Sequence, residues 1–449
     1  MKFVSTRGRA PEARFDEVLL AGLAPDGGLY VPVSWPRIDA TGSYVEVAQR
    51  VLKAFAGDSF GDDELREDIA AAYASFDDPR IAPLGRLGDL HLLELFHGPT
   101  LAFKDIAMQV LGRLFARALA KRGGRATVVA ATSGDTGSAA IAALGGLPNI
   151  EIFVMHPKGR VSEVQRRQMT TAAHANVHNI ALEGSFDDAQ AIVKDLFADT
   201  AFADAVSLTA VNSINFARIA AQSVYYHTAT AALGEPATFV VPTGNFGDAF
   251  AGEAAMRSGL AIERLIVATN ANDIMARALN DGVYEAGDAR HTLSPSMDIQ
   301  VASNFERVLF EASGRDAGYV REAMQNFAHA RRIVLPPAIR AALAERYAAA
   351  AVSDEETLAA MASRPGRLID PHTAVAVAAA GRFPSRGPKV VLSTAHPAKF
   401  PDAVREATGQ IPPLPPRLRD LFQNPEKFAV LSPSLGLVRD FIAARVPPL

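Results

Sequence analysis

The sequence predicts an α/β fold made of two lobes of mostly parallel sheet flanked by helices. Short runs of β-branched residues alternate with longer stretches of helical periodicity, which is typical of parallel strands joined by helices. The chain has 449 residues, enough for two or three domains. Its 49% hydrophobic and 21% charged residues match a folded globular protein rather than a disordered or fibrous one.

Residues 1–90 differ from the rest of the chain because helical patterns dominate them. Three segments carry apolar residues at helical spacing, namely 15–23, 45–55 and 62–73. A turn rich in Pro and Gly separates the first segment from the second. We therefore expect an α-rich N-terminal cap over residues 1–90.

Two α/β lobes are expected after the cap, over residues 91–235 and 236–410. The predicted strands are 127–131, 150–155 and 178–182 in the first lobe, and 239–242, 265–269 and 390–393 in the second. The predicted helices include 136–144, 186–197, 214–228 and 248–258. Ser185 and Ser353 precede acidic residues in patterns that indicate helix caps. The Pro-rich segment 411–416 predicts a linker into a C-terminal tail, residues 411–449.

Charge and composition exclude several classes of function. The net charge is −4 without a long block of like charge, which indicates neither a nucleic-acid nor a membrane partner. No cysteine occurs, so disulfides and thiol nucleophiles are excluded. The start of the chain lacks the apolar region of a signal peptide, and no uncharged apolar run reaches the roughly 18 residues of a membrane span. We expect a cytoplasmic protein that acts on a small molecule, as a monomer or homodimer.

Common catalytic motifs are absent or misplaced. The dinucleotide pattern G-x-G-x-x-G, the P-loop and the zinc motif H-E-x-x-H do not occur, so we expect no metal site. Residues 57–61 match the hydrolase pattern G-x-S-x-G, but a predicted helix precedes them where that motif needs a strand. We interpret this match as a chance occurrence in a loop.

Two glycine-containing loops each follow a predicted strand and open a predicted helix. They are Thr132-Ser133-Gly134-Asp135-Thr136-Gly137-Ser138 and Thr243-Gly244-Asn245-Phe246-Gly247-Asp248. Backbone N–H groups at a helix start favour an anion, and glycine allows a ligand to approach closely. One such loop could be an ordinary turn. Two of them suggest a ligand with two anionic groups, or a cofactor and a substrate with one each.

Lys104 is the candidate for covalent chemistry. It lies in the segment His97-Gly98-Pro99-Thr100-Leu101-Ala102-Phe103-Lys104-Asp105, where Gly-Pro predicts a turn and the following residues a helix. Burial and the positive helix end would both disfavour its ammonium form. A neutral lysine can form a Schiff base with an aldehyde. The alternative is a surface lysine whose charge reaches solvent.

The segment 97–109 and the two glycine loops resemble the signatures of threonine synthases, which are pyridoxal-phosphate enzymes of fold type II. Further agreement lies in Gly27-Gly28-Leu29-Tyr30-Val31-Pro32, residues 157–169, Asn212-Ser213-Ile214-Asn215-Phe216-Ala217-Arg218 and Ser393-Thr394-Ala395-His396-Pro397-Ala398-Lys399-Phe400. The resemblance runs from about residue 3 to residue 430 and fits the longer bacterial and fungal branch. Most other fold-type-II enzymes carry Asn where Asp135 stands, and threonine synthases carry Asp.

The resemblance implies a role for each matching residue. Lys104 would bind pyridoxal 5′-phosphate covalently, Thr394 would face the pyridine nitrogen, and Asp135 would approach the ring hydroxyl. Gly244, Asn245, Phe246, Gly247 and Asp248 would bind the cofactor phosphate. Ser133, Gly134, Thr136 and Gly137 would hold the substrate's carboxylate. Asn215 and Arg218 are candidates for its phosphate, with a solvated helix face as the alternative.

The implied reaction converts O-phospho-L-homoserine and water to L-threonine and phosphate, the last step of threonine biosynthesis. Lys104, once released from the cofactor, would act as a general base at Cα and later at Cβ. Phosphate leaves from Cγ and water adds at Cβ. Two alternatives stay open: another lyase of this fold, such as a serine or threonine dehydratase, and a paralogue that binds the cofactor without turnover.

Overall fold

The computed structural model describes residues 1–39, 41–132, 134–209, 213–363 and 366–446. They form two compact α/β units, which confirms the predicted fold class. Unit 1 comprises Met1–Gly98 and Ser213–Pro412, and unit 2 comprises Pro99–Asn212 and Pro413–Leu449. These boundaries differ from the four ranges expected from the sequence, since each unit combines segments that are distant in the chain.

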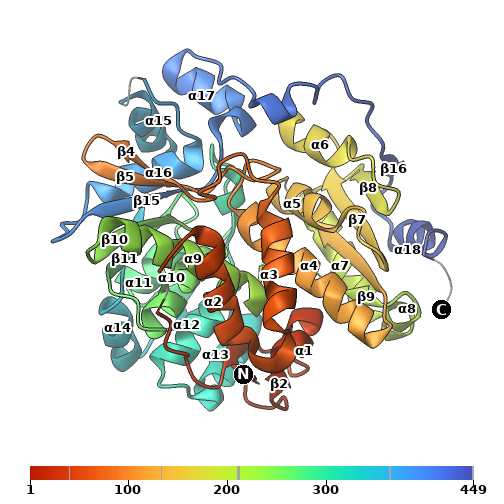
Figure 1. The fold of residues 1–449 in the computed structure, drawn as a ribbon, viewed down its shortest axis with the longest axis horizontal. Helices are drawn as coiled ribbons and strands as arrows, with labels where there is room; N and C mark the ends of the chain where they lie inside the picture. The colour runs from red at the N-terminus through yellow and green to blue at the C-terminus, as the bar shows by residue number, and fades with distance from the viewer. Residues whose placement is uncertain (40, 133, 210–212, 364–365, 447–449) are drawn as a thin grey trace. The chain divides into compact units, whose positions relative to one another are not determined.

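Unit 1 contains a six-stranded sheet in the order β14-β11-β10-β15-β5-β4. Its strands are β4 (Leu84–Leu87), β5 (Leu90–Glu94), β10 (Ala237–Pro242), β11 (Ile262–Thr269), β14 (Tyr347–Ala351) and β15 (Lys389–Ser393). All neighbours are parallel except β4 and β5, and Figure 1 shows β15, β10 and β11 next to one another. Every residue of β10 is buried, as expected for a central strand covered on both faces. The strands predicted for the second lobe are therefore confirmed.

Several helices of unit 1 pack on this sheet, and others pack on helices. They are α1 (Phe15–Ala21), α2 (Tyr44–Ala56), α3 (Asp62–Tyr73), α9 (Phe216–Leu233), α10 (Gly247–Arg257), α11 (Ile274–Asn280), α12 (Phe305–Ala312), α13 (Ala317–Ala330), α14 (Pro337–Ala344), α15 (Asp354–Ala362), α16 (Pro371–Ala380) and α17 (Pro401–Thr408). Nearly every residue of α16 is buried, because this helix packs on β10, β11 and β15. α9 packs along α10, and this pair carries several of the candidate site residues.

The N-terminal segment of unit 1 contains a small sheet that the sequence pattern did not reveal. β1 (Lys2–Ser5) pairs antiparallel with β2 (Ala13–Arg14) and β3 (Tyr30–Pro32). The three predicted helices are present as α1, α2 and α3. The expectation of an α-rich cap was therefore incomplete, because strands of 4, 2 and 3 residues are too short to show a clear alternation.

Unit 2 contains a five-stranded, fully parallel sheet in the order β16-β8-β7-β6-β9. Its strands are β6 (Ala126–Ala131), β7 (Ile150–Pro157), β8 (Val177–Leu182), β9 (Leu208–Thr209) and β16 (Ala429–Leu431). Its helices are α4 (Lys104–Arg122), α5 (Asp135–Leu144), α6 (Glu163–Thr170), α7 (Phe186–Ala198), α8 (Thr200–Ala205) and α18 (Leu435–Ala443). The three strands predicted for the first lobe are confirmed.

The C-terminal tail is an integral part of unit 2. Its strand β16 extends the sheet next to β8, and Val438 and Ile442 of α18 are fully buried in the core of the unit. Glu426 also accepts hydrogen bonds from Arg166 and Thr170 of α6. The Pro-rich segment thus leads into a strand and a helix that belong to the five-stranded sheet and the core of unit 2.

Residues 57–61 do not form a nucleophile elbow. Gly57–Ser59 form a single 3₁₀ turn between α2 and α3, so no strand precedes the serine. In the described ranges, no helix has the length and apolar character that would be needed to cross a membrane.

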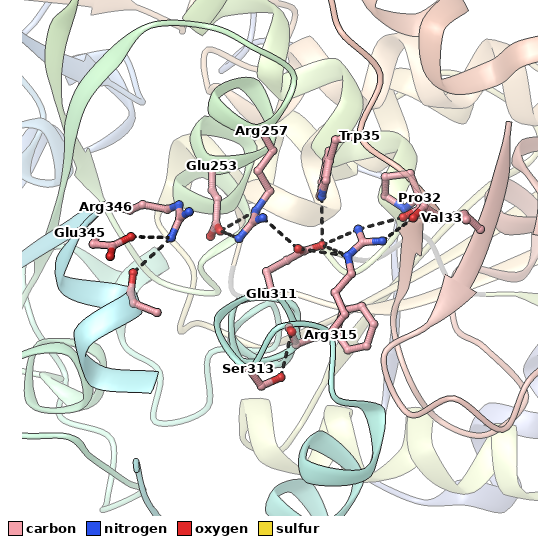
Figure 2. A network of polar contacts seen from close by, with 12 residues as sticks. Pro32, Val33, Trp35, Glu253, Arg257, Glu311, Ser313, Arg315, Glu345 and Arg346 are labelled. Carbon is pink, nitrogen blue, oxygen red and sulfur yellow. Dashed lines mark hydrogen bonds and ion pairs between the residues drawn. The ribbon is translucent and has the colours of Figure 1, made fainter. Parts of the chain in front are cut away.

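A network of buried ion pairs ties the N-terminal segment to α10 and α12 (Figure 2). Glu311 accepts hydrogen bonds from the Trp35 indole at 3.0 Å and from Arg315 Nη2 at 2.7 Å. Its other oxygen lies 3.0 Å from Arg257 Nη1, and Arg257 also pairs with Glu253 at 2.7 Å. Arg315 in turn donates to the carbonyl of Pro32. Since Glu253 and Arg257 belong to α10, this network anchors the helix that follows the second glycine loop.

Candidate active site

Lys104 is the first residue of α4 in unit 2. The turn before it is fixed by Asp105, which accepts hydrogen bonds from the Thr100 backbone N–H and hydroxyl, each at 2.7 Å. These bonds hold Leu101 at φ 61°, a left-handed conformation that is rare for a leucine. The Lys104 side chain is only 12% exposed, so the alternative of a surface lysine is wrong.

Asp135 faces Lys104. Its Oδ2 lies 3.3 Å from the Lys104 Nζ, and its Oδ1 accepts a 2.8 Å hydrogen bond from the Gln165 side-chain amide. No local sequence pattern indicates this pairing or the contact with Gln165.

In the first glycine loop, two backbone N–H groups are bonded within the loop, and one side chain is partly exposed. The Thr132 hydroxyl accepts hydrogen bonds from the backbone N–H groups of Gly134 and Gly137, at 3.0 and 2.9 Å. The hydrogen bonds of these two N–H groups are therefore made within the loop. Thr136, in contrast, is partly exposed. Gly134 has φ 139°, and a Cβ there would lie 2.5 Å from Gln165, so only glycine fits. Ser133 lies outside the described residues.

The second glycine loop presents a row of open backbone donors. In the described part of the chain, no hydrogen-bond acceptor is found for the N–H groups of residues 244–248. They precede and begin α10, a helix of 11 residues, and Phe246 has φ 62°. A left-handed residue next to a helix start can turn successive N–H groups toward one concave side, which suits an anion. This geometry fits the phosphate group that the sequence led us to expect here.

The side chain of Asp248 contacts α9. Its carboxylate accepts hydrogen bonds from the Tyr225 and Tyr226 hydroxyls, and Oδ2 has no hydrogen-bond partner among the described residues. Burial raises the pKa of Asp248 to about 7, while the two tyrosine hydroxyls act in the opposite direction. Only the backbone of Asp248 is therefore placed to bind an anion at the loop.

We expect Asp248→Asn to change how stability depends on pH. The folded protein keeps the Asp248 proton up to about pH 7, whereas an unfolded aspartic acid releases it near pH 4. The stabilising contribution is thus complete below about pH 4 and is lost as the pH rises to about 7, with a slope of up to about 1.4 kcal/mol per pH unit. Denaturant unfolding of the ligand-free protein across this range should show a flatter profile for the variant. Equal slopes would mean that the folded carboxyl is already ionised near pH 4.

Thr394 directly follows β15 and is buried. The end of this strand is fixed by a chain of side chains in which the Thr373 hydroxyl donates to Asp370 and lies 3.1 Å from the Ser393 hydroxyl. Asp370 also caps α16 through the backbone N–H of His372. Ser393, the residue before Thr394, is therefore held by hydrogen bonds that the sequence pattern did not indicate.

Asn215 and Arg218 lie at the start of α9, and both are buried. The Asn215 side chain caps the helix by accepting from the Ala217 N–H and donates to the Leu19 carbonyl at 2.8 Å. Both ends of this amide are thus engaged within the protein, which weakens the prediction that it binds a substrate.

Arg218 differs, since it is 3% exposed and neither Nε nor Nη1 has a hydrogen-bond partner among the described residues. Burial lowers the pKa of its guanidinium to about 10. The alternative of a solvated helix face is wrong for this residue. A buried and incompletely bonded cation is instead suited to an anionic ligand.

Three protein-family models match the chain. The model described as "Pyridoxal-phosphate dependent enzyme" matches residues 81–350. The models "Threonine synthase N terminus" and "Threonine synthase, C-terminal" match residues 2–73 and 373–442. The matches therefore include the N-terminal segment, the central α/β part and the C-terminal region.

Whole-chain comparisons agree with these matches. A protein named threonine synthase from Pseudomonas aeruginosa is 48% identical, with 99% of this chain and 98% of that protein covered. The crystal structure of a PLP-bound threonine synthase from Brucella melitensis has 49% sequence identity and a TM-score of 0.97, covering 99% of both chains. The threonine synthase structure from yeast has 36% identity and a TM-score of 0.94, over 99% of this chain and 98% of that one.

Proposed function

The chain belongs to the threonine synthase family and is a pyridoxal-phosphate-dependent enzyme, and from this premise we propose that it converts O-phospho-L-homoserine and water to L-threonine and phosphate. The observation that carries the proposal is the match of both flanking segments, residues 2–73 and 373–442, to threonine synthase models. A match to the central pyridoxal-phosphate part alone would suit a dehydratase equally well.

The residues of this chain suit the cofactor. We assign its phosphate group to the open N–H row of residues 244–248 and its covalent attachment to Lys104, with Thr394 at the ring nitrogen and Asp135 near the ring hydroxyl. When bound, pyridoxal phosphate withdraws electrons from the substrate and so acidifies its Cα and Cβ protons. The Lys104 amine then moves protons at these two carbons, and Asp135, held by Gln165, orients that amine.

The substrate side of the site is assigned to the first glycine loop and to Arg218. We assign the substrate's carboxylate to Ser133, Gly134, Thr136 and Gly137, and the partial exposure of Thr136 supports this assignment. The Gly134 and Gly137 N–H groups would have to leave the Thr132 hydroxyl to bind it. The Arg218 guanidinium supplies a cation for the substrate's phosphate, with Asn215 holding the helix start beside it. The net charge of −4 and the lack of basic blocks support a small-molecule partner without nucleic acid or membrane, and we propose a cytoplasmic location.

The reaction is tested by supplying O-phospho-L-homoserine to the purified, cofactor-loaded protein. We expect phosphate and threonine to appear in equal amounts. Formation of 2-oxobutyrate from threonine, without phosphate release from O-phospho-L-homoserine, would indicate a dehydratase instead. No turnover of either compound would indicate a cofactor-binding paralogue.

Arg218→Met is expected to lower kcat/KM for O-phospho-L-homoserine about 10- to 100-fold, because hydrogen bonds to a charged group are lost. Most of the change should appear in KM, and inhibition by inorganic phosphate should weaken in parallel. Thermal stability of the ligand-free protein should stay equal or rise, because an unpaired buried charge opposes folding. Arg277→Met, on the partly exposed face of α11, serves as the control. A loss of stability with unchanged kcat/KM would contradict this role for Arg218.

A further inference from the structure

We propose that Asn304 is a positioning residue that sets the orientation of the loop 244–248, and that it thereby controls how tightly the cofactor phosphate is held. This inference rests on the proposed function, because it assumes that the loop binds that phosphate. Asn304 is fully buried and immediately precedes α12, outside the motifs that resemble those of threonine synthases.

Asn304 contacts the loop through two donors. Its backbone N–H and its side-chain amide both donate to the carbonyl of Asn245, each at 3.1 Å. The same side-chain amide donates to the carbonyl of Ser213 at 3.1 Å, just before α9. One residue thus connects the phosphate loop to the turn that leads to Arg218.

Arg307 fixes the orientation of the Asn304 amide. It is fully buried and donates through Nη1 to the Asn304 Oδ1, so the amide nitrogen must face the two carbonyls. Its other nitrogens donate to the carbonyls of Tyr30 and Ile214, at 3.0 and 2.6 Å. The amide therefore has a single favourable orientation in this setting.

The planarity of the peptide bond links this contact to the open donors. In a trans peptide, the carbonyl of one residue and the N–H of the next point in opposite directions. Because Asn304 holds the Asn245 carbonyl, the Phe246 N–H must point away from Asn304, and it has no acceptor among the described residues. Phe246 is also held at φ 62°, which costs free energy for a residue other than glycine. The Asn304 bonds help to keep this conformation in the absence of a ligand.

Gly244 restricts the loop on its other side. A Cβ at this position would lie 2.8 Å from the Ser296 carbonyl oxygen, so the loop passes directly against that backbone. Replacement of the Asn304 side chain leaves the Asn245 carbonyl with only the backbone N–H of residue 304, so the Asn245–Phe246 peptide can rotate its N–H away from a bound phosphate more easily. It also removes the side-chain contacts with the Ser213 carbonyl and with Arg307, while the backbone contact keeps the loop next to α12. The expected defect is therefore weaker cofactor binding rather than general unfolding.

The test compares Asn304→Ala, Asn304→Asp and Asn280→Ala with the wild-type protein. Asn280 is the matched control, because its amide also donates to a carbonyl, that of Ala349, and makes no contact with the loop. The readouts are the dissociation constant of pyridoxal phosphate from absorbance titration, the ³¹P NMR shift of the bound phosphate, and the melting temperature of the ligand-free protein. Asn304→Asp keeps the size and the acceptor for Arg307 but replaces the donor with an acceptor.

We expect both Asn304 variants to weaken cofactor binding about 10- to 100-fold and to move the ³¹P resonance toward that of free cofactor, with Asn280→Ala within about two-fold of wild type. Equal cofactor binding by wild type and the Asn304 variants would overturn the inference, as would a defect confined to the aspartate variant, which would reflect charge alone. If the alanine variant does not fold, Asn304→Ser takes its place in the same assays. Failure of the wild-type protein itself to bind the cofactor would instead contradict the proposed function.

Discussion

Lys104→Ala is expected to remove the visible absorption band of the bound cofactor and to lower turnover by more than about 1,000-fold. In the described residues of unit 2, Lys104 is held at the start of α4 with its amine 3.3 Å from Asp135. No other residue is assigned the covalent link or the proton transfers at Cα and Cβ. Absorbance spectra of the purified variant and its rate of phosphate release measure the two effects separately.

The matched control is Lys158→Ala. Lys158 lies in the same unit and pairs with Glu183 at 2.9 Å, but its side chain is 52% exposed. This variant should keep both the absorption band and the rate. An unchanged band in Lys104→Ala would refute the assignment of the covalent link, since the cofactor would then be attached elsewhere or not at all.

Glu311→Ala is expected to lower the free energy of unfolding by about 3–5 kcal/mol, the usual cost of removing one partner from a buried ion-pair network. The Glu311 side chain is 2% exposed, and it bonds to Trp35, Arg257 and Arg315 (Figure 2). Its loss leaves the Arg315 guanidinium without an acidic partner among the described residues and removes the acceptor of the Trp35 indole. Denaturant unfolding at neutral pH measures the change.

Glu285→Ala provides the comparison for this prediction. Glu285 pairs with Arg332 at 3.8 Å, and both side chains are 50% exposed, so the expected change is below about 1 kcal/mol. Equal effects of the two substitutions would show that the buried network adds no more stability than a surface pair. A large effect of Glu311→Ala should also reduce cofactor affinity, because Glu253 and Arg257 anchor the helix that begins at the phosphate loop.

The sequence predicted the regular elements of the fold well because they are long and strongly periodic. All six expected strands are present, and the capping patterns at Ser185 and Ser353 form as expected. The small N-terminal sheet escaped prediction because its strands are very short. The composition of the two units escaped it as well, since strand pairings such as β15 with β5 and β16 with β8 join segments that lie far apart in the chain.

The sequence identified the residues that would carry the chemistry of the candidate site better than the residues that hold them in place. Lys104 and the two glycine loops follow from local patterns, and the resemblance gave Asp135 and Thr394. The supporting contacts come from elsewhere in each unit: Gln165 on Asp135, the two tyrosines on Asp248, and Asn304 on the phosphate loop. No local pattern distinguishes these residues from other polar side chains, because their roles depend on tertiary packing.

The most direct test of the central claim is the fate of solvent oxygen during turnover of O-phospho-L-homoserine in ¹⁸O-labelled water. Phosphate loss from Cγ by C–O cleavage, followed by addition of water at Cβ, predicts one ¹⁸O atom in the hydroxyl group of threonine and none in the released phosphate. Mass spectrometry of both products gives the answer. Label in the phosphate with homoserine as the co-product would mean simple hydrolysis of the ester, and would contradict the proposed function.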